Sequence, residues 1–260
     1  MRIRQPRVAE LVADRLRERI LSGELAAGAL LPKQDELIAE FGVAPPSLRE
    51  GLRILETEGL IRVRRGNVGG AVVSPPRPEA VASMLAMVLE SRGAPIDDVA
   101  ASLGELESLA ATMAARQPDR SRVVTALRSR IEASRTAPDT ASYVALARAF
   151  HEDLVAGCGN ETIRVVVGAV ESVWSAHVDA LTSRTPDLDT FDDPAFRERS
   201  IAAHEAITDA IERGDPAAAA RLLDEHMHDP KQHRFTGEGR PVQSSLTRDR
   251  RGATAGGAAP

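Results

Sequence analysis

The segment from Ser74 to Pro78 constrains the fold of this chain more than any other. It places prolines at three of four consecutive positions, and prolines stiffen the backbone and prevent a helix from running through it. Strand-like alternation and glycine-rich turns precede the segment, whereas helical periodicity follows it. A chain of 260 residues is long enough for two modest domains. We therefore expect domains at residues 4–75 and 79–230, joined by a linker at 76–78.

The first domain is predicted to contain three helices followed by a hairpin. Apolar residues recur every four positions from Val8 to Ile20, as on one face of an amphipathic helix. Leu31–Pro32 is predicted to open a second short helix, and Pro45–Pro46 a third, because proline is tolerated in a first helical turn. Leu60–Arg64 alternates like a half-buried strand and returns, after a glycine-rich turn, as Ala71–Val73.

This order of elements predicts a winged helix-turn-helix domain, whose second motif helix enters the major groove of DNA. Ser47 and Arg49 lie in the first turns of that helix, where base edges are met, and Arg53 is better placed for phosphate. Arg62 adds charge to the wing. The candidate DNA-contacting residues are Lys33, Ser47, Arg49, Arg53, Arg64, Arg65 and Gly66. The alternative is that these are ordinary solvated charges on a small subdomain.

The formal net charge of −5 argues against a nucleic-acid partner only if the charge is spread evenly. Residues 1–75 hold 12 Lys and Arg against 10 Asp and Glu, residues 76–230 hold 15 against 26, and residues 231–260 hold 6 against 2. The acidity therefore belongs to the second domain. Aromatic residues make up only 3% of the chain, so the core must be aliphatic.

The second domain is predicted to be an all-α helical bundle, which makes the whole chain mainly α. The expected helices are 79–92, 96–117, 119–135, 139–157, 160–184, 194–213 and 215–228. Residues 185–195 are acidic and contain prolines, which predicts a surface loop. Residues 231–260 are polar and rich in Gly, Ala and Pro, and we expect this tail to be disordered.

Three histidines, His151, His204 and His226, fall on three different predicted helices, each within an apolar stretch. Three neutral imidazoles that converge could bind Zn²⁺ or a similar ion. The spacing alone favours ordinary core or surface histidines over a metal site. A second alternative is a helical three-histidine metalloenzyme with the winged domain as an interaction module. Glu152 and Asp153 adjoin His151, but adjacent residues do not share a helix face, which weakens that alternative.

The stretch from Leu31 to Gly70 resembles the winged-helix domain of GntR-type bacterial regulators. It carries Leu-Pro, Gly-Val, Leu-Arg-Glu, Glu-Gly-Leu and a glycine wing in order. The resemblance implies that Arg49 and Gly66 contact the operator. Ala44 replaces the Ser or Thr that caps the recognition helix in many relatives, a loss of about 1 kcal/mol. Asp35 and Pro45 stand where fatty-acid-responsive relatives have base-reading arginines, so the operator need not be theirs.

Residues 79–230 are similar, through looser motifs, to the helical effector domain of the FadR subfamily, called the FCD domain. The motifs are Phe150-His151, Cys158-Gly159-Asn160, His204-Glu205, Gly214-Asp215 and His226-Met227. The resemblance implies a divalent metal such as zinc, held by one Asp and three His, that helps to hold a small carboxylate effector. The Asp position is Ala147 here, and an arginine of many relatives corresponds to Leu103. Two possibilities remain. The histidines bind a metal with water at the vacant Asp position, or the domain binds an apolar ligand without a metal.

Together these features predict a ligand-responsive bacterial transcription regulator that is not an enzyme. We expect it to bind a pseudo-palindromic double-stranded DNA operator as a homodimer, because two-fold proteins read two-fold sites. A small metabolite in the second domain is expected to modulate that affinity. No apolar run approaches the ~20 residues of a membrane span, and the N-terminus has no signal-peptide pattern. We therefore expect a cytoplasmic protein without a membrane partner.

Overall fold

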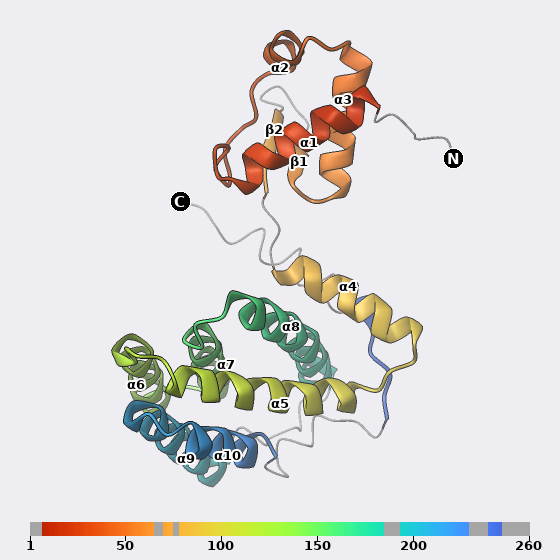
Figure 1. Ribbon diagram of the computed structural model, residues 1–260. Helices are drawn as coiled ribbons and strands as arrows, with labels where there is room; N and C mark the ends of the chain where they lie inside the picture. Colours follow the sequence, from red (N-terminus) through yellow and green to blue (C-terminus); the bar gives the residue numbers. More distant parts are fainter. Residues whose placement is uncertain (1–6, 65–69, 75–77, 185–192, 229–238, 246–260) are drawn as a thin grey trace, which may run out of the picture. The chain divides into compact units, whose positions relative to one another are not determined.

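The computed structural model describes residues 7–64, 70–74, 78–184, 193–228 and 239–245 (Figure 1). Contacts between residues divide the chain into two compact units, Met1–Arg77 and Pro78–Pro260. The division falls inside the proline-rich segment, of which residues 75–77 lie outside the described part of the chain. Pro78, which we expected in the linker, is the first residue of a helix.

The first unit contains α1 (Val8–Leu21), α2 (Gln34–Phe41), α3 (Pro45–Thr57), β1 (Ile61–Arg64) and β2 (Gly70–Val73). The two strands are antiparallel, with Ile61 opposite Val73. Helix α1 packs on α3, and the fully buried Leu16, Leu48 and Leu55 lie in the core between the elements. The order of helix, helix, helix and hairpin confirms the winged helix-turn-helix prediction.

The segment before α2 differs from its predicted structure. The backbone N–H of Leu31 donates to the carbonyl of Ala71 at 2.8 Å, and Leu30 forms a bridge with Val72. Helix α2 begins only at Gln34. The prediction that Leu31–Pro32 opens the helix was therefore wrong, because the backbone of this segment pairs with the edge of β2.

Helix α3 begins without a side-chain cap, as the sequence predicted. Ala44 is its N-cap residue, and Pro45, which has no N–H to satisfy, is the first helical residue. Gly51 in the same helix is buried against α1. A Cβ at Gly51 would lie 3.0 Å from the carbonyl oxygen of Ala9, so glycine permits this close crossing of α1 and α3.

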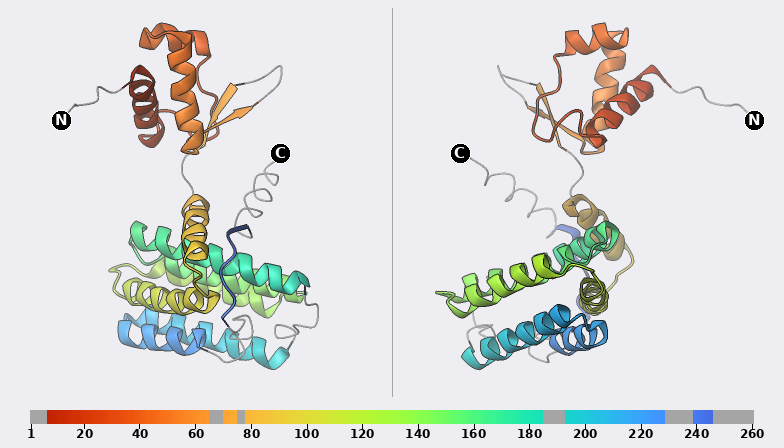
Figure 2. Two further views of the ribbon diagram at one scale, coloured as in Figure 1. Left: turned by 90° about the vertical axis from the view of Figure 1, so that its right-hand side faces the viewer. Right: turned by 60° about the vertical axis from the view of Figure 1, so that its left-hand side comes forward.

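The second unit is built from helices that all fall on predicted segments. They are α4 (Pro78–Ser91), α5 (Ile96–Ala115), α6 (Ser121–Arg135), α7 (Thr140–Ala156), α8 (Glu161–Arg184), α9 (Pro194–Arg213) and α10 (Pro216–Met227). Helix α5 lies between a layer of α7 and α8 and a layer of α9 and α10 (Figures 1 and 2). Helix α4 packs on α8, and α6 packs on both α7 and α9. None of the helices that the structure describes is both long and apolar enough to cross a membrane.

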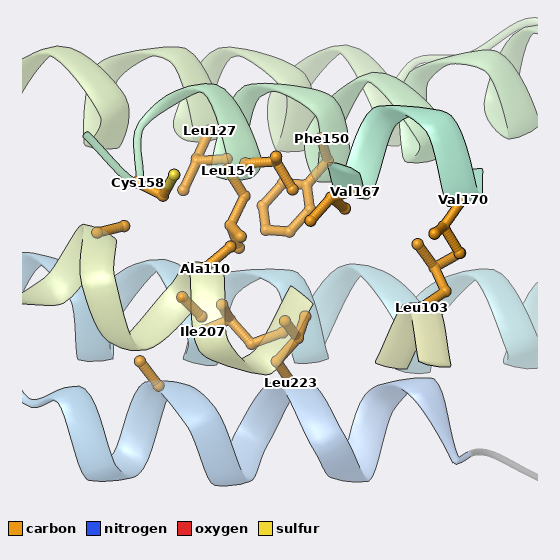
Figure 3. Packing of buried hydrophobic residues seen from close by; sticks show 14 of the residues in the cluster. Leu103, Ala110, Leu127, Phe150, Leu154, Cys158, Val167, Val170, Ile207 and Leu223 are labelled. Carbon is orange, nitrogen blue, oxygen red and sulfur yellow. The ribbon is translucent and has the colours of Figure 1, made fainter. Parts of the chain in front are cut away.

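The core of the second unit is aliphatic around the central helix α5. Figure 3 shows its packing, with Leu103 and Ala110 of α5 facing residues of the neighbouring helices. Small alanines on the buried face of α5 allow these neighbours to approach closely. Cys158 is a free thiol that is fully buried in the same core. Among the described residues, α5 is thus the element that contacts α7, α8, α9 and α10 together.

Part of the C-terminal tail is ordered against the second unit, contrary to expectation. The N–H of Ile96 donates to the carbonyl of Arg240 at 2.8 Å, and the N–H of Val242 donates to that of Ala94 at 3.0 Å. Val242 is only 2% exposed. The expected disorder of residues 231–260 is therefore wrong for residues 239–245. The sequence did not indicate this order, because main-chain pairing and one buried valine produce no periodic pattern of apolar residues. The rest of that tail, and the acidic residues 185–192, lie outside the described ranges.

Candidate functional site

Helix α3 presents its basic residues to solvent. Arg49 and Arg53 are exposed, and Ser47 is half-buried. Arg53 lies 3.9 Å from Glu50, and both side chains are largely exposed, so this pair contributes little to stability. Arg49 makes no ion pair with any described residue. Its guanidinium is therefore free to contact a partner.

The remaining candidate DNA contacts lie on neighbouring elements. Lys33 precedes α2 and is exposed. Its backbone N–H donates to the Glu36 carboxylate at 3.0 Å. Arg62 and Arg64 are exposed on β1, two residues apart and hence on one face of the strand. Arg65 and Gly66 lie outside the described residues.

Other arginines of the first unit have a structural role. Arg17 of α1 donates to both carboxylate oxygens of Glu58, with Nε to Oε2 at 2.9 Å and Nη2 to Oε1 at 2.6 Å. This fork ties the C-terminal end of α3 to α1. The hydrogen bonds that Arg17 donates to Glu58 and then to Asp14 raise the pKa of Arg17. Arg17 therefore links α1 to the C-terminal end of α3, whereas Arg49 and Arg53 of α3 extend into solvent.

In the second unit, the three predicted histidines meet. His151 comes from α7, His204 from α9 and His226 from α10, and one ring nitrogen of each lies within 4.8 Å of the others. The Nε2 atoms of His204 and His226 are 3.1 Å apart. The ring of His204 stacks on Phe150, with centroids 3.9 Å apart. The structure thus brings together residues that are 75 positions apart in sequence.

Glu107 of α5 belongs to this histidine cluster, although the sequence analysis did not propose it. Its Oε2 lies 2.5 Å from Nδ1 of His151, and the residue is 2% exposed. A proton on Nδ1 that is donated to Glu107 leaves the lone pair of His151 on Nε2. A signal was present in the sequence: Leu103, Glu107 and Ala111 are four residues apart, so a carboxylate interrupts an apolar helix face.

The protonation of the three histidines differs with their surroundings. Burial, and then the nearby His151, lowers the pKa of His226 to about 3. Burial and the two neighbouring histidines lower the pKa of His204. Burial also acts against charge on His151, but the Glu107 carboxylate outweighs it and raises the pKa. His204 and His226 are therefore neutral at pH 7, with nitrogen lone pairs available.

This donor set fits a divalent metal. Zinc binds imidazole nitrogens at about 2.0–2.1 Å, which places two nitrogens of a tetrahedral site about 3.3 Å apart. The His204–His226 nitrogen distance of 3.1 Å is close to that value. Ala147 offers no further ligand atom, so three histidines would leave a coordination position open.

A cavity of about 130 Å³ adjoins the histidines. Leu103 and Ala147, the positions where the resemblance implies polar residues, both line it. Tyr143, Ala147 and His151 are four residues apart on α7 and share one face. The small side chain of Ala147 therefore opens space between a phenol and an imidazole. The other lining residues are Glu107, Val144, Arg148, Glu171, Trp174, Ser175, Val178, Phe196, Ser200, His204, His226 and Met227.

The chain combines a winged helix-turn-helix domain with a helical domain that contains a pocket beside three histidines, an architecture typical of DNA-binding regulators with an effector domain. Two family models match the chain: bacterial regulatory proteins of the gntR family over residues 8–72, and the FCD domain over residues 98–229. The chain belongs to the gntR family of bacterial regulatory proteins, and its FCD domain is the effector domain of the FadR subfamily. It is thus a DNA-binding transcription regulator with an FCD effector-binding domain.

Relatives of known class agree with this assignment. An uncharacterized HTH-type transcriptional regulator of Mycobacterium tuberculosis is 28% identical over 226 residues, which cover 85% of this chain and 87% of the relative. The HTH-type transcriptional repressor NanR of Citrobacter rodentium is 27% identical over 226 residues, with 85% and 83% covered. The structure of a Streptococcus agalactiae GntR protein aligns with a TM-score of 0.59 at 22% identity, covering 86% of this chain and 99% of that one. This last match concerns the fold alone.

Proposed function

We propose that this regulator binds a pseudo-palindromic operator as a homodimer and that a small molecule in the FCD cavity changes the affinity for DNA. The observation that carries the proposal is the exposed Arg49 on α3, which has no ion-pair partner in the described part of the chain. An arginine held this way can bond a guanine edge through two N–H groups. Lys33, Arg53 and Arg64 supply phosphate contacts around it, and Arg65 and Gly66 extend them along the wing.

The homodimer is supported by an apolar stripe on α4. Val81, Met84 and Val88 are 45%, 59% and 43% exposed, and their spacing of three and four residues places them on one helix face. Solvent exposure of such a stripe is unfavourable, and a second copy of the chain would cover it. Met84→Glu should shift the protein toward monomer in light-scattering measurements, whereas Leu109→Glu, at an exposed leucine of α5, should not.

We further propose that His151, His204 and His226 hold a divalent metal such as zinc, with Glu107 as the orienting partner of His151. Such an ion supplies positive charge and Lewis acidity beside the cavity. The role is sensory and not catalytic. A metalloenzyme needs a free base near the metal, whereas Glu107 is engaged by His151 and Glu171 by Ser175 and Arg148. Turnover of a substrate by the purified protein would contradict this part of the proposal.

The relatives named NanR are transcriptional repressors, and we propose repression for this chain too. Effector binding would then lower operator affinity and release the promoter. This requires two conformations of the dimer that differ in operator affinity, and an effector that binds one of them more tightly.

The operator experiment tests the proposal directly. Wild-type protein is used to select fragments from a genomic library, and binding is measured by electrophoretic shift at fixed salt. Arg49→Ala should bind the operator at least about 100-fold more weakly than wild type. A loss of this order is expected when a bidentate base contact and the contacts beside it are removed. Arg221→Ala, which removes an exposed arginine of α10, is the matched control. Failure of wild-type protein to select any fragment, or full affinity in Arg49→Ala, contradicts the proposal.

A further inference from the structure

Two further pockets reach the histidine cluster from different layers of the second unit. A pocket of about 430 Å³ is lined by residues of α7 and α8, and it includes His151 and Glu107. A pocket of about 170 Å³ is lined by residues of α9 and α10, and it includes His226. Each pocket shares lining residues with the cavity beside the histidines. Both are therefore candidate routes by which an ion could reach the cluster.

The α7–α8 pocket runs from exposed residues to buried ones. Glu152 and Arg164 are exposed and form its mouth, whereas Glu107 at its inner end is 2% exposed. Of the three histidines, His204 and His226 are buried and His151 is half-buried. His151 is thus the histidine that lies nearest to solvent, and it lies at the end of this pocket.

Carboxylates line the α7–α8 pocket along its depth. Glu152 is exposed, Glu171 is half-buried and Glu107 is buried. A cleft lined by one sign of charge raises the local concentration of the opposite ion and its rate of association. Carboxylate oxygens are also ligands that divalent cations accept in exchange for water. The pocket therefore has the charge that a route for a divalent cation requires.

Glu152 is the carboxylate of this pocket that remains uncommitted. The other three have partners, which are His151 for Glu107, Arg130 for Asp153 at 2.8 Å, and Arg148 for Glu171 at 3.5 Å. Glu152 makes no hydrogen bond or ion pair with any residue that the structure describes. The pocket's one arginine, Arg164, is paired with Glu161 at 2.9 Å. The charge of Glu152 is therefore the one at the mouth that no described partner offsets.

The α9–α10 pocket lacks this excess of negative charge. Its charged lining residues outside the histidine are Arg199 and Glu225, and both are exposed. Glu225 accepts from Arg221 at 2.7 Å, so its charge is offset. A cation that approaches this pocket meets the guanidinium of Arg199 without an uncommitted carboxylate beside it.

We propose that the α7–α8 pocket is the entry route of the divalent cation and that Glu152 draws the ion in from solvent. Glu152 then controls how fast the site is loaded, whereas the three histidines determine how tightly the ion is held. This inference rests on the proposed metal site. Glu152 and Glu225 make a matched pair for testing it, because each adjoins one of the histidines in sequence and each lines one of the two pockets.

The test measures the rate of Zn²⁺ uptake by metal-free full-length protein in a stopped-flow instrument, with a fluorescent chelator reporting the free ion. Glu152→Gln should slow association about fivefold, as expected when one charge that acts on a divalent ion through water is removed. Glu152→Lys, which reverses the charge, should slow association about 25-fold. Glu225→Gln should leave the rate within about twofold of wild type, because Arg221 already offsets that charge. Glu152 and Glu225 are exposed, and thermal melting establishes that each variant is folded.

Two further readouts separate a route from a simple effect on the bound ion. Entry and exit cross the same barrier, so transfer of Zn²⁺ to excess chelator should also be slower in Glu152→Gln. A residue that only stabilised the bound ion would make this transfer faster when removed. Salt screens charges at the mouth, so raising the salt concentration should slow uptake by wild type and by Glu225→Gln more than uptake by Glu152→Gln.

Failure of this inference is distinguishable from failure of the proposed metal site. If wild type binds Zn²⁺ but Glu152→Gln loads at the wild-type rate, the route is overturned and the metal site stands. Faster release from Glu152→Gln also overturns the route. Equal slowing by Glu152→Gln and Glu225→Gln overturns the assignment to the α7–α8 pocket. If wild type binds no Zn²⁺, the proposed metal site fails, and the route fails with it.

Discussion

Nδ1 of His151 on α7 lies 2.5 Å from Oε2 of Glu107 on α5, inside a cluster that also contains His204 and His226. The carboxylate fixes the ring orientation and directs the second nitrogen of His151 away from α5. Glu107 is therefore a positioning residue for the proposed metal site, and its contribution can be measured separately from that of the ligands.

Glu107→Gln should lower metal affinity without removing a ligand. The amide has nearly the same shape but holds the imidazole more weakly, and loss of such a partner costs about 10- to 100-fold in affinity. Competition titrations with Zn²⁺ measure the change. Glu105→Gln, at an exposed position of the same helix, is the control. Unchanged affinity in Glu107→Gln would remove this residue from the site.

Metal content should depend on all three histidines. Wild-type protein reconstituted with Zn²⁺ should retain about one ion per chain after dialysis, because three neutral imidazoles form a usable site. His151→Ala, His204→Ala and His226→Ala should each retain far less, whereas His228→Ala should match wild type. Elemental analysis of the dialysed proteins gives the result. Equal content in wild type and His151→Ala would show that the histidines do not hold the metal.

Two arginines of α3 should affect DNA binding in different ways. Arg49→Ala should remove the preference for the operator over unrelated DNA, because base contacts carry specificity. Arg53→Ala should weaken binding to all sequences and reduce the slope of log affinity against log salt by about one, as for a lost phosphate contact. Electrophoretic shifts at several salt concentrations separate the two. A specificity loss in Arg53→Ala with an unchanged slope would reverse these assignments.

Acid should destabilise the metal-free protein. The pKa of His226 is lowered to about 3 in the folded state, whereas an unfolded histidine titrates near 6.5. Below pH ~6.5 the unfolded state therefore binds more protons, and the free energy of unfolding falls as pH decreases. By pH 5 this histidine accounts for about 2 kcal/mol. His204, whose pKa is also lowered, acts in the same direction.

His151 has the opposite sign, because its raised pKa gives stability below pH ~6.5 that is lost as pH rises through the folded value. Urea unfolding at pH 5, 6 and 7 measures the sum. His226→Asn should show a shallower dependence than wild type, and His228→Asn should not. Equal slopes for wild type and His226→Asn would mean that His226 is not held neutral.

The C-terminal segment at residues 239–245 should contribute to the stability of the FCD domain. Val242→Asp places a charge at a position that is 2% exposed and should destabilise the protein by about 2 kcal/mol or more. Gln243→Asp, one residue further on and exposed, should change stability by less than about 0.5 kcal/mol. Thermal melting measures both. Equal melting temperatures for the two variants would show that the segment does not pack on the domain in solution.

The sequence alone determined the fold class, the two-domain organisation and nearly every helix. Periodic apolar residues and prolines are local signals, and they act on the same backbone that they predict. The motifs of the winged domain also led to the prediction, still to be tested, that α3 is the recognition helix. The start of α2 was wrong because Leu31 pairs with Ala71, forty residues away, and no local pattern records that pairing.

Tertiary structure decided the composition of the FCD site. Helix packing around α5 brought His151, His204 and His226 together, where the sequence had left ordinary core histidines as an alternative. Glu107 of α5 and Arg148 of α7 line the same cavity because the helix faces that carry them pack around it. This arrangement depends on helix packing and not on sequence periodicity. Local propensity fixes which helices form, but only their mutual packing determines which polar side chains share a buried space.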